Sequence, residues 1–293
     1  MRGWGQLEGE RLVGSMKGVC RLCGRHGLVE HGIVRSHALV RCPACGFVQT
    51  TTVVDSQLSG FYERDYFEGK LAHGFGSAGG SETDGIADPP AAEVEWLASR
   101  YLDPLDPRAV LEIGPGLSGG WIKRFARDPT RRLQCVEVSA LAAARLNAAG
   151  IPTFNGRVED FHSETPFDLA VAIEVIEHVT DPVSLVAAIG DLLVPGGHLF
   201  LSTGNTRSVT ARRSGLEWYY LDPPAHLSYF DDRNITQLLR DGGFDKVDVL
   251  RFGFKWVELA LRYRVTGVLP LLHALNYASG MLVLARKAVA GRS

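Results

Sequence analysis

The chain has little of what marks several common classes of protein. Its 293 residues include only five cysteines, and 31 Lys and Arg residues stand against 33 Asp and Glu. So few cysteines exclude a secreted scaffold held together by many disulfides. A net charge of −2 gives no basic field over the whole chain that would attract nucleic acid. No basic and apolar signal sequence opens the chain, so we expect a cytoplasmic protein.

Long uninterrupted apolar runs are absent too. The most apolar late stretch, residues 265–284, contains four interrupting residues: Pro270, His273, Asn276 and Gly280. The sequence therefore predicts no membrane-spanning helix. With 45% hydrophobic residues the chain can still bury a substantial core, and we expect one large domain and one small one.

Four of the five cysteines form two pairs near the start of the chain. Cys20 and Cys23 make one Cys-x-x-Cys pair, and Cys42 and Cys45 make a second after 18 intervening residues. Each pair places two thiolates on one tight turn, and two such turns make a tetrahedral cage for Zn²⁺. We expect short strands between them, and hence a zinc ribbon over residues 18–50. Four sulfur ligands close the coordination sphere, so the expected zinc is structural and not catalytic.

The segments on either side of the ribbon carry weaker signals. Residues 1–17 show no periodicity, and we expect them to be disordered. Residues 51–90 are rich in glycine and serine in their second half, which is typical of a linker. Tyr62 and Tyr66 leave a second interpretation open, in which this segment is a lid that closes over a ligand.

The expected main domain, residues 91–293, is organised around the stretch AVLEIGPGLSGG at residues 109–120. Its apolar run predicts a buried strand and its glycines predict a tight turn, and the spacing of residues 121–126 predicts a helix after the turn. Glycine lets such a turn adopt positive φ and lets a ligand approach the backbone closely. Open α/β sheets bind nucleotide-like ligands at this kind of turn.

Strands and helices then alternate, which predicts a parallel sheet covered by helices. The expected strands cover residues 109–113, 132–138, 152–154, 167–173 and 198–202. The expected helices cover residues 91–101, 140–150, 181–193 and 232–241, with one or two amphipathic helices over 252–277.

Acidic residues follow three of the expected strands. Glu137 ends the second strand, where a carboxylate can accept both hydroxyls of a ribose. Glu159 and Asp160 follow the third, where one of them can accept from an adenine amino group, and Glu174 ends the fourth. S-adenosylmethionine carries a sulfonium and an ammonium but no phosphate, so it fits this acidic rim better than a dinucleotide does.

Five motifs in order resemble those of class I S-adenosylmethionine-dependent methyltransferases over about residues 90–290: LEIGPGLSGG, CVEVS, RVEDF, FDLAVAIEVIEHV and VPGGHL. The resemblance implies a Rossmann-like α/β fold with a seven-stranded sheet whose last strand is antiparallel. Residues 246–251 and 280–286 would form the closing hairpin. It also implies the cofactor-binding residues: Glu112, Gly114 and Gly116 at the methionine portion, Glu137 at the ribose, Val158 and Glu159 at the adenine, and Glu174 near the sulfonium.

Structural roles stay open for several of these side chains. The carboxylates of Glu112 and Glu174 would serve equally to cap neighbouring backbone amides. Glu177 and His178, expected at the start of the helix after the fourth strand, are interpreted more readily as holding that loop than as doing chemistry.

An irregular segment, residues 205–230, follows the fifth strand, and its aromatic residues predict a substrate wall beside the cofactor. Its ending, HLSYF, resembles zinc-ribbon-bearing methyltransferases of bacterial sugar and natural-product pathways, in which the matching histidine is proposed as a base. Ala225 stands where many of those relatives have glutamate, which weakens the case for methylation of carbon. The expected wall residues are Tyr62, Tyr66, His178, Tyr219, Tyr220 and Tyr229.

These observations predict a methyltransferase that acts on a hydroxyl of a small molecule. His226 is the expected general base because an imidazole is suited to deprotonating a hydroxyl at neutral pH. A histidine that only donates a hydrogen bond to its own loop is the structural alternative.

Three other functions stay open. The first fifty residues carry seven basic against three acidic residues, which keeps an RNA methyltransferase with a substrate-gripping ribbon in view. A non-catalytic cofactor-binding protein and a dehydrogenase are the others. The sequence does not choose the acceptor, the methylated atom or the oligomeric state.

Overall fold

The computed structural model describes residues 16–51, 98–117, 120–252 and 279–289. Most of the expected linker, including Tyr62 and Tyr66, lies outside these ranges, as do most of the expected helix over 91–101 and nearly all of the segment 252–277. No helix within the described ranges has the length and apolar character needed to cross a membrane.

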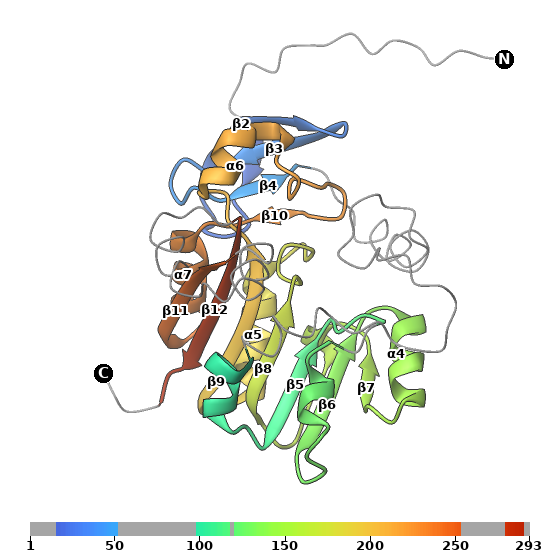
Figure 1. Ribbon diagram of the computed structural model, residues 1–293. Helices are drawn as coiled ribbons and strands as arrows, with labels where there is room; N and C mark the ends of the chain where they lie inside the picture. The colour runs from blue at the N-terminus through green and yellow to red at the C-terminus, as the bar shows by residue number, and fades with distance from the viewer. Residues whose placement is uncertain (1–15, 52–97, 118–119, 253–278, 290–293) are drawn as a thin grey trace, which may run out of the picture.

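A seven-stranded sheet forms the main body of the protein (Figure 1). Its strands are β5 (Ala109–Ile113), β6 (Arg132–Glu137), β7 (Thr153–Asn155), β8 (Phe167–Ile173), β9 (Leu193–Gly204), β11 (Phe244–Phe252) and β12 (Gly280–Lys287). Their order in the sheet is β11-β12-β9-β8-β5-β6-β7. Strands β5 to β9 pair in parallel, and β12 is antiparallel to both of its neighbours. The expected methyltransferase sheet with its antiparallel strand is confirmed.

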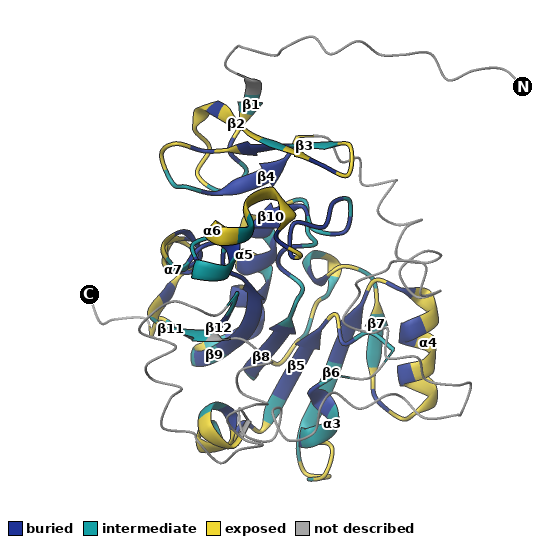
Figure 2. Cartoon of the chain, turned by 45° about the horizontal axis from the view of Figure 1, so that its top comes forward, coloured by how far each residue is buried: buried dark blue, intermediate teal, exposed yellow. Residues whose placement is uncertain are grey.

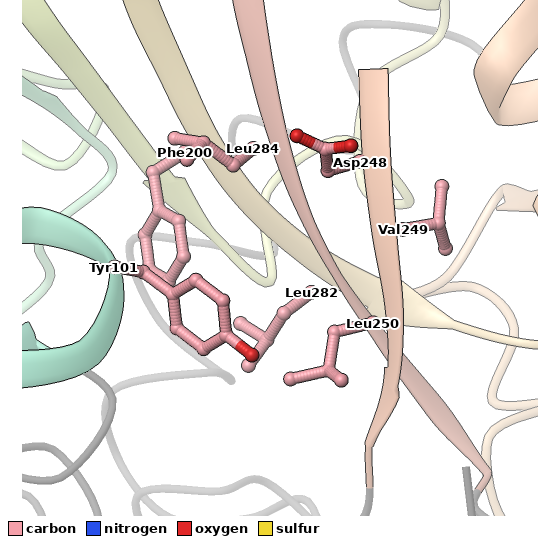
Figure 3. Close-up of a pocket in the computed structure, with 7 residues that line it drawn as sticks. All are labelled: Tyr101, Phe200, Asp248, Val249, Leu250, Leu282 and Leu284. Atoms are coloured by element: carbon pink, nitrogen blue, oxygen red, sulfur yellow. The ribbon is translucent and has the colours of Figure 1, made fainter. Parts of the chain in front are cut away.

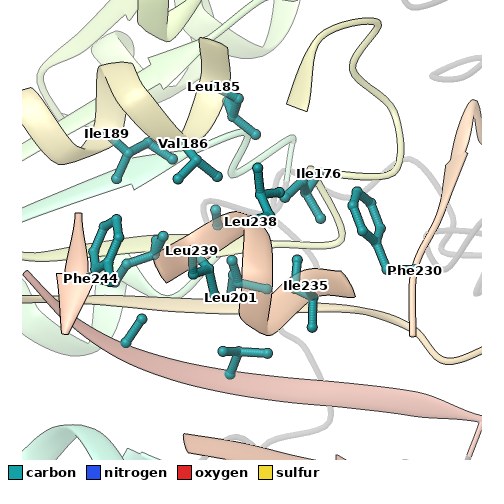
Figure 4. Packing of buried hydrophobic residues seen from close by; sticks show 14 of the residues in the cluster. Ile176, Leu185, Val186, Ile189, Leu201, Phe230, Ile235, Leu238, Leu239 and Phe244 are labelled. Atoms are coloured by element: carbon teal, nitrogen blue, oxygen red, sulfur yellow. The ribbon is translucent and has the colours of Figure 1, made fainter. Parts of the chain in front are cut away.

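Helices cover both faces of this sheet. α5 (Pro182–Leu192) and α7 (Asp232–Asp241) pack side by side on one face (Figure 4). α3 (Ile122–Phe125) and α4 (Ala140–Ala148) contribute to a second cluster on the other. Figure 2 shows the central strands buried between these layers while one face of α4 is exposed. The short elements are η2 (Ala98–Leu102), η3 (Asp103–Leu105), η4 (Val158–Asp160), α6 (Val209–Ser214) and η5 (Gly215–Glu217).

Side-chain caps fix where the longer helices begin. Ser139 accepts from the Ala142 amide at the start of α4, and Asp181 accepts from two amides at the start of α5. Asp231 and Asn234 form a reciprocal capping box at the start of α7. Each cap satisfies amides that the helix itself leaves unpaired, which explains why these starts were predictable.

Two expectations about this region were wrong. Glu177 and His178 lie in a turn, because Asp181 caps α5 and Pro182 occupies its first position, so the helix cannot begin earlier. β9 begins at Leu193, directly after α5, and not at His198. The intervening residues were expected to form a turn, but Leu193 already pairs with Phe167 of β8 across a bulge.

A second sheet contains the cysteines. Its strands are β1 (Met16–Val19), β2 (His26–Val34), β3 (His37–Arg41), β4 (Val48–Thr50) and β10 (Ser228–Tyr229). β10 comes from the end of the segment expected to cap the substrate, and it pairs antiparallel with β4 (Figure 1). Ribbon and cap also share a hydrophobic core: Val34, Leu39 and Val48 pack with Ala211, Trp218, Tyr220, Leu221 and Tyr229. The cap is therefore built onto the ribbon as well as onto the main sheet.

Candidate active site

The glycine turn after β5 leaves space beside the backbone. Gly114 and Gly116 have φ of 64° and 62°. A Cβ added to Gly114 would lie 2.8 Å from a methyl group of Val175, whereas one added to Gly116 would meet nothing within 4 Å. Gly114 is thus needed for packing, and Gly116 faces open space at the rim where the parallel strands end.

Glu137 lies beside this open position. Its Oε2 accepts from the Gly116 amide at 2.9 Å, and its Oε1 accepts from the Ser139 amide at 2.9 Å. Burial raises the pKa of Glu137, and the amide hydrogen bonds oppose that rise. Two carboxylate oxygens at the end of β6 present the acceptors that a ribose diol requires. The structure therefore brings together the glycine turn and the carboxylate expected to hold the ribose.

Glu112 caps α3. Its two oxygens accept from the backbone amides of Trp121 and Ile122, at 2.8 and 2.5 Å. A Cβ on Gly120 would lie only 2.0 Å from Glu112 Oε1, so the chain needs a glycine there. Burial raises the pKa of Glu112 to about 8. Of the two roles left open by the sequence, the structure shows the cap; contact with the methionine portion stays a prediction.

The expected adenine-binding residues lie one strand further along. Val158 is buried in η4, which follows β7, and Glu159 is partly exposed and pairs with Arg157 at 3.0 Å. Because β7 is the neighbour of β6, both residues lie on the side of Glu137 away from β5. Their contact with adenine stays a prediction.

After the end of β8, Tyr220 joins two carboxyl groups, those of the half-buried Glu174 and the buried Glu177. The Tyr220 hydroxyl lies 3.0 Å from Glu174 Oε2 and 2.5 Å from Glu177 Oε1. Ser202 donates to Glu174 at 2.6 Å, and Thr203 donates to Glu177 at 3.0 Å. Burial raises the pKa of both carboxyls, that of Glu174 to about 8 with the Glu177 charge as a second cause.

The sequence did not predict this network. Tyr220 was expected to face substrate and Glu177 to hold a loop, yet the two bond to each other. One feature of the sequence could have indicated this network. Ser202 and Thr203 lie side by side near the end of β9, and their hydroxyls can donate to carboxylates that follow the neighbouring strand.

Two histidines lie beside the carboxyl pair. His226 Nδ1 lies 2.7 Å from the Tyr220 carbonyl, and His178 Nδ1 lies 2.9 Å from the Ala225 carbonyl. A carbonyl only accepts, so in each neutral ring Nδ1 carries the proton and Nε2 carries the lone pair. The rings meet edge to face with centroids 4.7 Å apart. Burial lowers the pKa of both imidazoles, that of His226 to about 3, so both are neutral at pH 7.

Glu177, His178 and His226 also form a possible set of metal ligands. One ligand atom from each lies within 4.8 Å of the others. A carboxylate and two imidazoles suit a divalent cation, and the backbone carbonyls that hold both Nδ1–H groups would orient the rings toward it.

The four paired cysteines form a closed site. Cys20 and Cys45 have sulfurs 3.7 Å apart, and so do Cys23 and Cys42. Sulfurs at the corners of a tetrahedron around Zn²⁺ at about 2.3 Å lie about 3.8 Å from one another. The four cysteines therefore fit a structural zinc ion.

The expected substrate wall needs correction. Tyr229 is buried in the core shared by ribbon and cap and donates to the His226 carbonyl at 2.7 Å, so it supports the loop and does not face a ligand. Tyr220 is buried as well. Tyr219 is 52% exposed and bonds to Ser279, which leaves it able to face an acceptor.

A separate cavity of about 180 Å³ lies against β9, β11 and β12 (Figure 3). It is lined by Tyr101, Phe200, Asp248, Val249, Leu250, Leu282 and Leu284. None of the predicted site residues is among them. Its largely apolar lining offers no match for a nucleoside, and we assign it no role in the reaction.

Comparison with known proteins agrees with this geometry. A family model described as a methyltransferase domain matches residues 91–249. The ubiquinone biosynthesis O-methyltransferase of Thiobacillus denitrificans is 33% identical over 193 residues, covering 60% of this chain and 82% of that protein. The enzyme of the same name from Cereibacter sphaeroides is 32% identical over 186 residues, covering 56% and 71%.

A solved structure has the same fold. A SAM-dependent methyltransferase from Archaeoglobus fulgidus superimposes with a TM-score of 0.51 at 15% identity, over 67% of this chain and 94% of that one. The ribbon precedes the residues matched by the family model, which start at 91. The chain belongs to the class I methyltransferase family, and it is an S-adenosylmethionine-dependent enzyme with a zinc ribbon before its catalytic domain.

Proposed function

We propose that this enzyme transfers a methyl group to a hydroxyl oxygen of a small organic molecule, with His226 as the general base. The observation that carries the proposal is the fixed tautomer of His226: the Tyr220 carbonyl holds Nδ1–H and leaves the lone pair on Nε2, in a ring that lies beside Glu177 and His178. The relatives named above are O-methyltransferases, which supports oxygen as the acceptor atom and a small molecule over RNA.

Binding of the donor would rest on the rim of the sheet. Glu137 would accept from the ribose hydroxyls, Gly116 would let the methionine portion pass close to the backbone, and Val158 with Glu159 would meet the adenine. Glu174 would lie near the positive sulfur. S-adenosylmethionine supplies an electrophilic methyl group on a sulfonium.

The reaction is an in-line displacement, so orientation of the acceptor supplies much of the rate. In that displacement the cofactor would give up its methyl group and keep the carbon–sulfur electron pair, and His226 Nε2 would accept the proton of the acceptor hydroxyl. The low pKa of His226 would keep Nε2 unprotonated at neutral pH, and the acceptor oxygen would release its proton as it gains positive charge from the methyl group. The Tyr220 carbonyl, bound to Nδ1–H, would stabilise the imidazolium that forms.

The short distances among Glu177, His178 and His226 favour a second role for His226, as a metal ligand. Glu177, His178 and His226 would hold a divalent cation that binds the acceptor. The two accounts differ at His178, which is a ligand in one and a neighbour of the base in the other.

Turnover of two variants tests the proposal. His226→Ala should lower kcat by about 10²–10⁴ while adenosylhomocysteine affinity, measured by calorimetry, stays unchanged. His178→Ala should lower kcat far less, with no response to added Mg²⁺. An unchanged rate in His226→Ala would exclude His226 as the base. Equal losses of kcat in His226→Ala and His178→Ala, together with a dependence of turnover on Mg²⁺, would support the bound cation instead. His198→Ala, in the middle of β9 opposite Arg286 of β12, is the control.

We propose further that the enzyme works in the cytoplasm. Reducing conditions there keep the four cysteine thiolates available for zinc.

A further inference from the structure

The loop that carries His226 is held between the zinc ribbon and the turn that carries Glu177. Leu227, the next residue after His226, is held from both directions. Its amide donates to the Glu177 carbonyl at 2.7 Å. Its own carbonyl accepts from Arg21 Nη2 at 2.6 Å and from the Thr50 amide at 3.1 Å. Both of these donors belong to the ribbon.

Arg21 lies on the first zinc knuckle, between Cys20 and Cys23. Its backbone amide donates to Gln49 Oε1 at 2.9 Å, which ties the knuckle to β4. Its side chain is half-buried, and its Nε atom is withdrawn from water. Withdrawing a guanidinium from water is unfavourable unless it makes a strong contact. The charge-assisted bond to the Leu227 carbonyl is such a contact.

The ribbon also holds the loop on both sides of Leu227. Arg35, in the turn between β2 and β3, forms an ion pair with Asp222, whose carbonyl accepts from the His226 amide at 3.0 Å. On the other side, Phe47 packs on Phe230 with ring centroids 5.1 Å apart. The histidine loop is thus attached to the ribbon before and after His226.

We propose that the ribbon is a positioning unit for His226, and that Arg21 is the positioning residue that joins the zinc knuckle to the active-site loop. The zinc-bound cysteines fix the knuckle, the knuckle fixes the guanidinium, and the guanidinium fixes the carbonyl next to the histidine. This inference rests on the proposed role of His226 for its effect on the reaction, but not for its effect on the histidine itself.

Substitution of Arg21 on the full-length enzyme tests this chain of contacts. Arg21→Met removes the donor and keeps much of the side-chain volume, and Arg21→Lys keeps the charge. Arg25→Met is the matched control, because Arg25 is exposed on the same knuckle. For each variant we would measure zinc content, adenosylhomocysteine affinity, kcat and KM, and the ¹⁵N NMR signals of the His226 ring.

We expect Arg21→Met to keep its zinc and its cofactor affinity, to lose at least about tenfold in kcat with little change in KM, and to shift the His226 ring signals. Arg21→Lys should restore part of both effects, and Arg25→Met should show neither. Unmoved His226 signals in Arg21→Met overturn the inference whatever happens to kcat. Shifted His226 signals with an unchanged kcat support the positioning inference and contradict the proposed role of His226 as the base.

Arg35→Met carries the test should Arg21→Met lose its zinc. Arg35 lies away from the cysteines, and its ion pair reaches the same loop through Asp222. The same shift of the His226 signals is expected, and its absence in a zinc-loaded Arg35→Met variant overturns the inference.

Discussion

At the scale of single residues, burial and hydrogen bonding compete at Glu112. Glu112 is 2% exposed, and its carboxyl accepts hydrogen bonds from the backbone amides of Trp121 and Ile122 at the start of α3. The amides favour the charged form, but removal from water dominates and raises its pKa to about 8. Glu112 is therefore a cap whose strength depends on pH.

Stability should fall with rising pH because of Glu112. Its folded pKa lies above its ordinary value of 4.5, so the folded state binds more protons than the unfolded state between pH 4.5 and about 8. The stability of wild type relative to Glu112→Gln should therefore decrease across this window, by at most about 1.4 kcal/mol per pH unit, and level off above it. Urea unfolding of both proteins measures this difference. A difference that grows with pH contradicts the assignment.

Gly120 should not tolerate a methyl group. Its φ of 44° already disfavours alanine, and the added Cβ would collide with Glu112 Oε1. We expect Gly120→Ala to lose about 3 kcal/mol of unfolding free energy or more. Gly243→Ala is the control, since its φ is also positive but its Cβ would meet nothing within 4 Å. Equal losses of unfolding free energy in Gly120→Ala and Gly243→Ala would contradict this prediction, because the contact with Glu112 would then add no cost.

At the scale of elements, the sequence predicted the features that depend on residues close together in the chain. Ser139 caps the helix that it was expected to cap, and of Asp231 and Asp232, which the sequence left open, Asp231 is the cap of α7. Asp181 was expected as the first residue of α5 and is its cap. These starts could be predicted closely because a cap needs only the next three residues. The strand at 167–173 was predicted with its observed limits, since a buried parallel strand is a continuous apolar run.

Distant pairings could not be predicted. Tyr229 of β10 pairs with Val48 of β4, and no periodicity in either segment indicates this partner. The Tyr220 hydroxyl reaches Glu174 and Glu177, which are 46 and 43 residues away. Such contacts depend on how the ribbon packs on the cap. For the site, therefore, the sequence predicted that Glu137 and the glycine turn lie together, but it did not predict the contacts of Tyr220 and Tyr229.

The capping box of α7 gives a prediction at this scale. Asp231 accepts from the amides of Arg233 and Asn234. Asp231→Ala should lower the unfolding free energy by about 1 kcal/mol, and Asp231→Asn by less because asparagine also caps well. Urea unfolding of the two variants would separate them. Equal losses in Asp231→Asn and Asp231→Ala would mean that the charge, and not the cap, matters, because both variants remove the charge and only asparagine keeps a capping oxygen.

At the scale of the whole molecule, the two sheets carry different parts of the proposed site. The glycine turn and Glu137 lie on the seven-stranded sheet, while the loop of His226 is attached to the ribbon sheet through β10. The proposed cofactor and acceptor sides therefore depend on different parts of the protein.

Removal of zinc should separate these two sides. Chelation should lower turnover at least about tenfold, because the ribbon loses the metal that joins its two cysteine turns. Adenosylhomocysteine affinity should change little, and added zinc should restore turnover. Calorimetry and activity assays before and after chelation measure both. Parallel loss of cofactor affinity and turnover would contradict the division.

The central claim is that the donor lies against the glycine turn after β5. Calorimetric titration of Gly116→Ala with adenosylhomocysteine tests it against Gly150→Ala, whose glycine also has positive φ and an open Cβ position but ends α4. Both variants should lose similar stability, since both place alanine at positive φ. The account predicts that Gly116→Ala loses at least about tenfold in affinity, or about 1.4 kcal/mol, while Gly150→Ala binds as wild type does. Equal affinities in the two variants would contradict it.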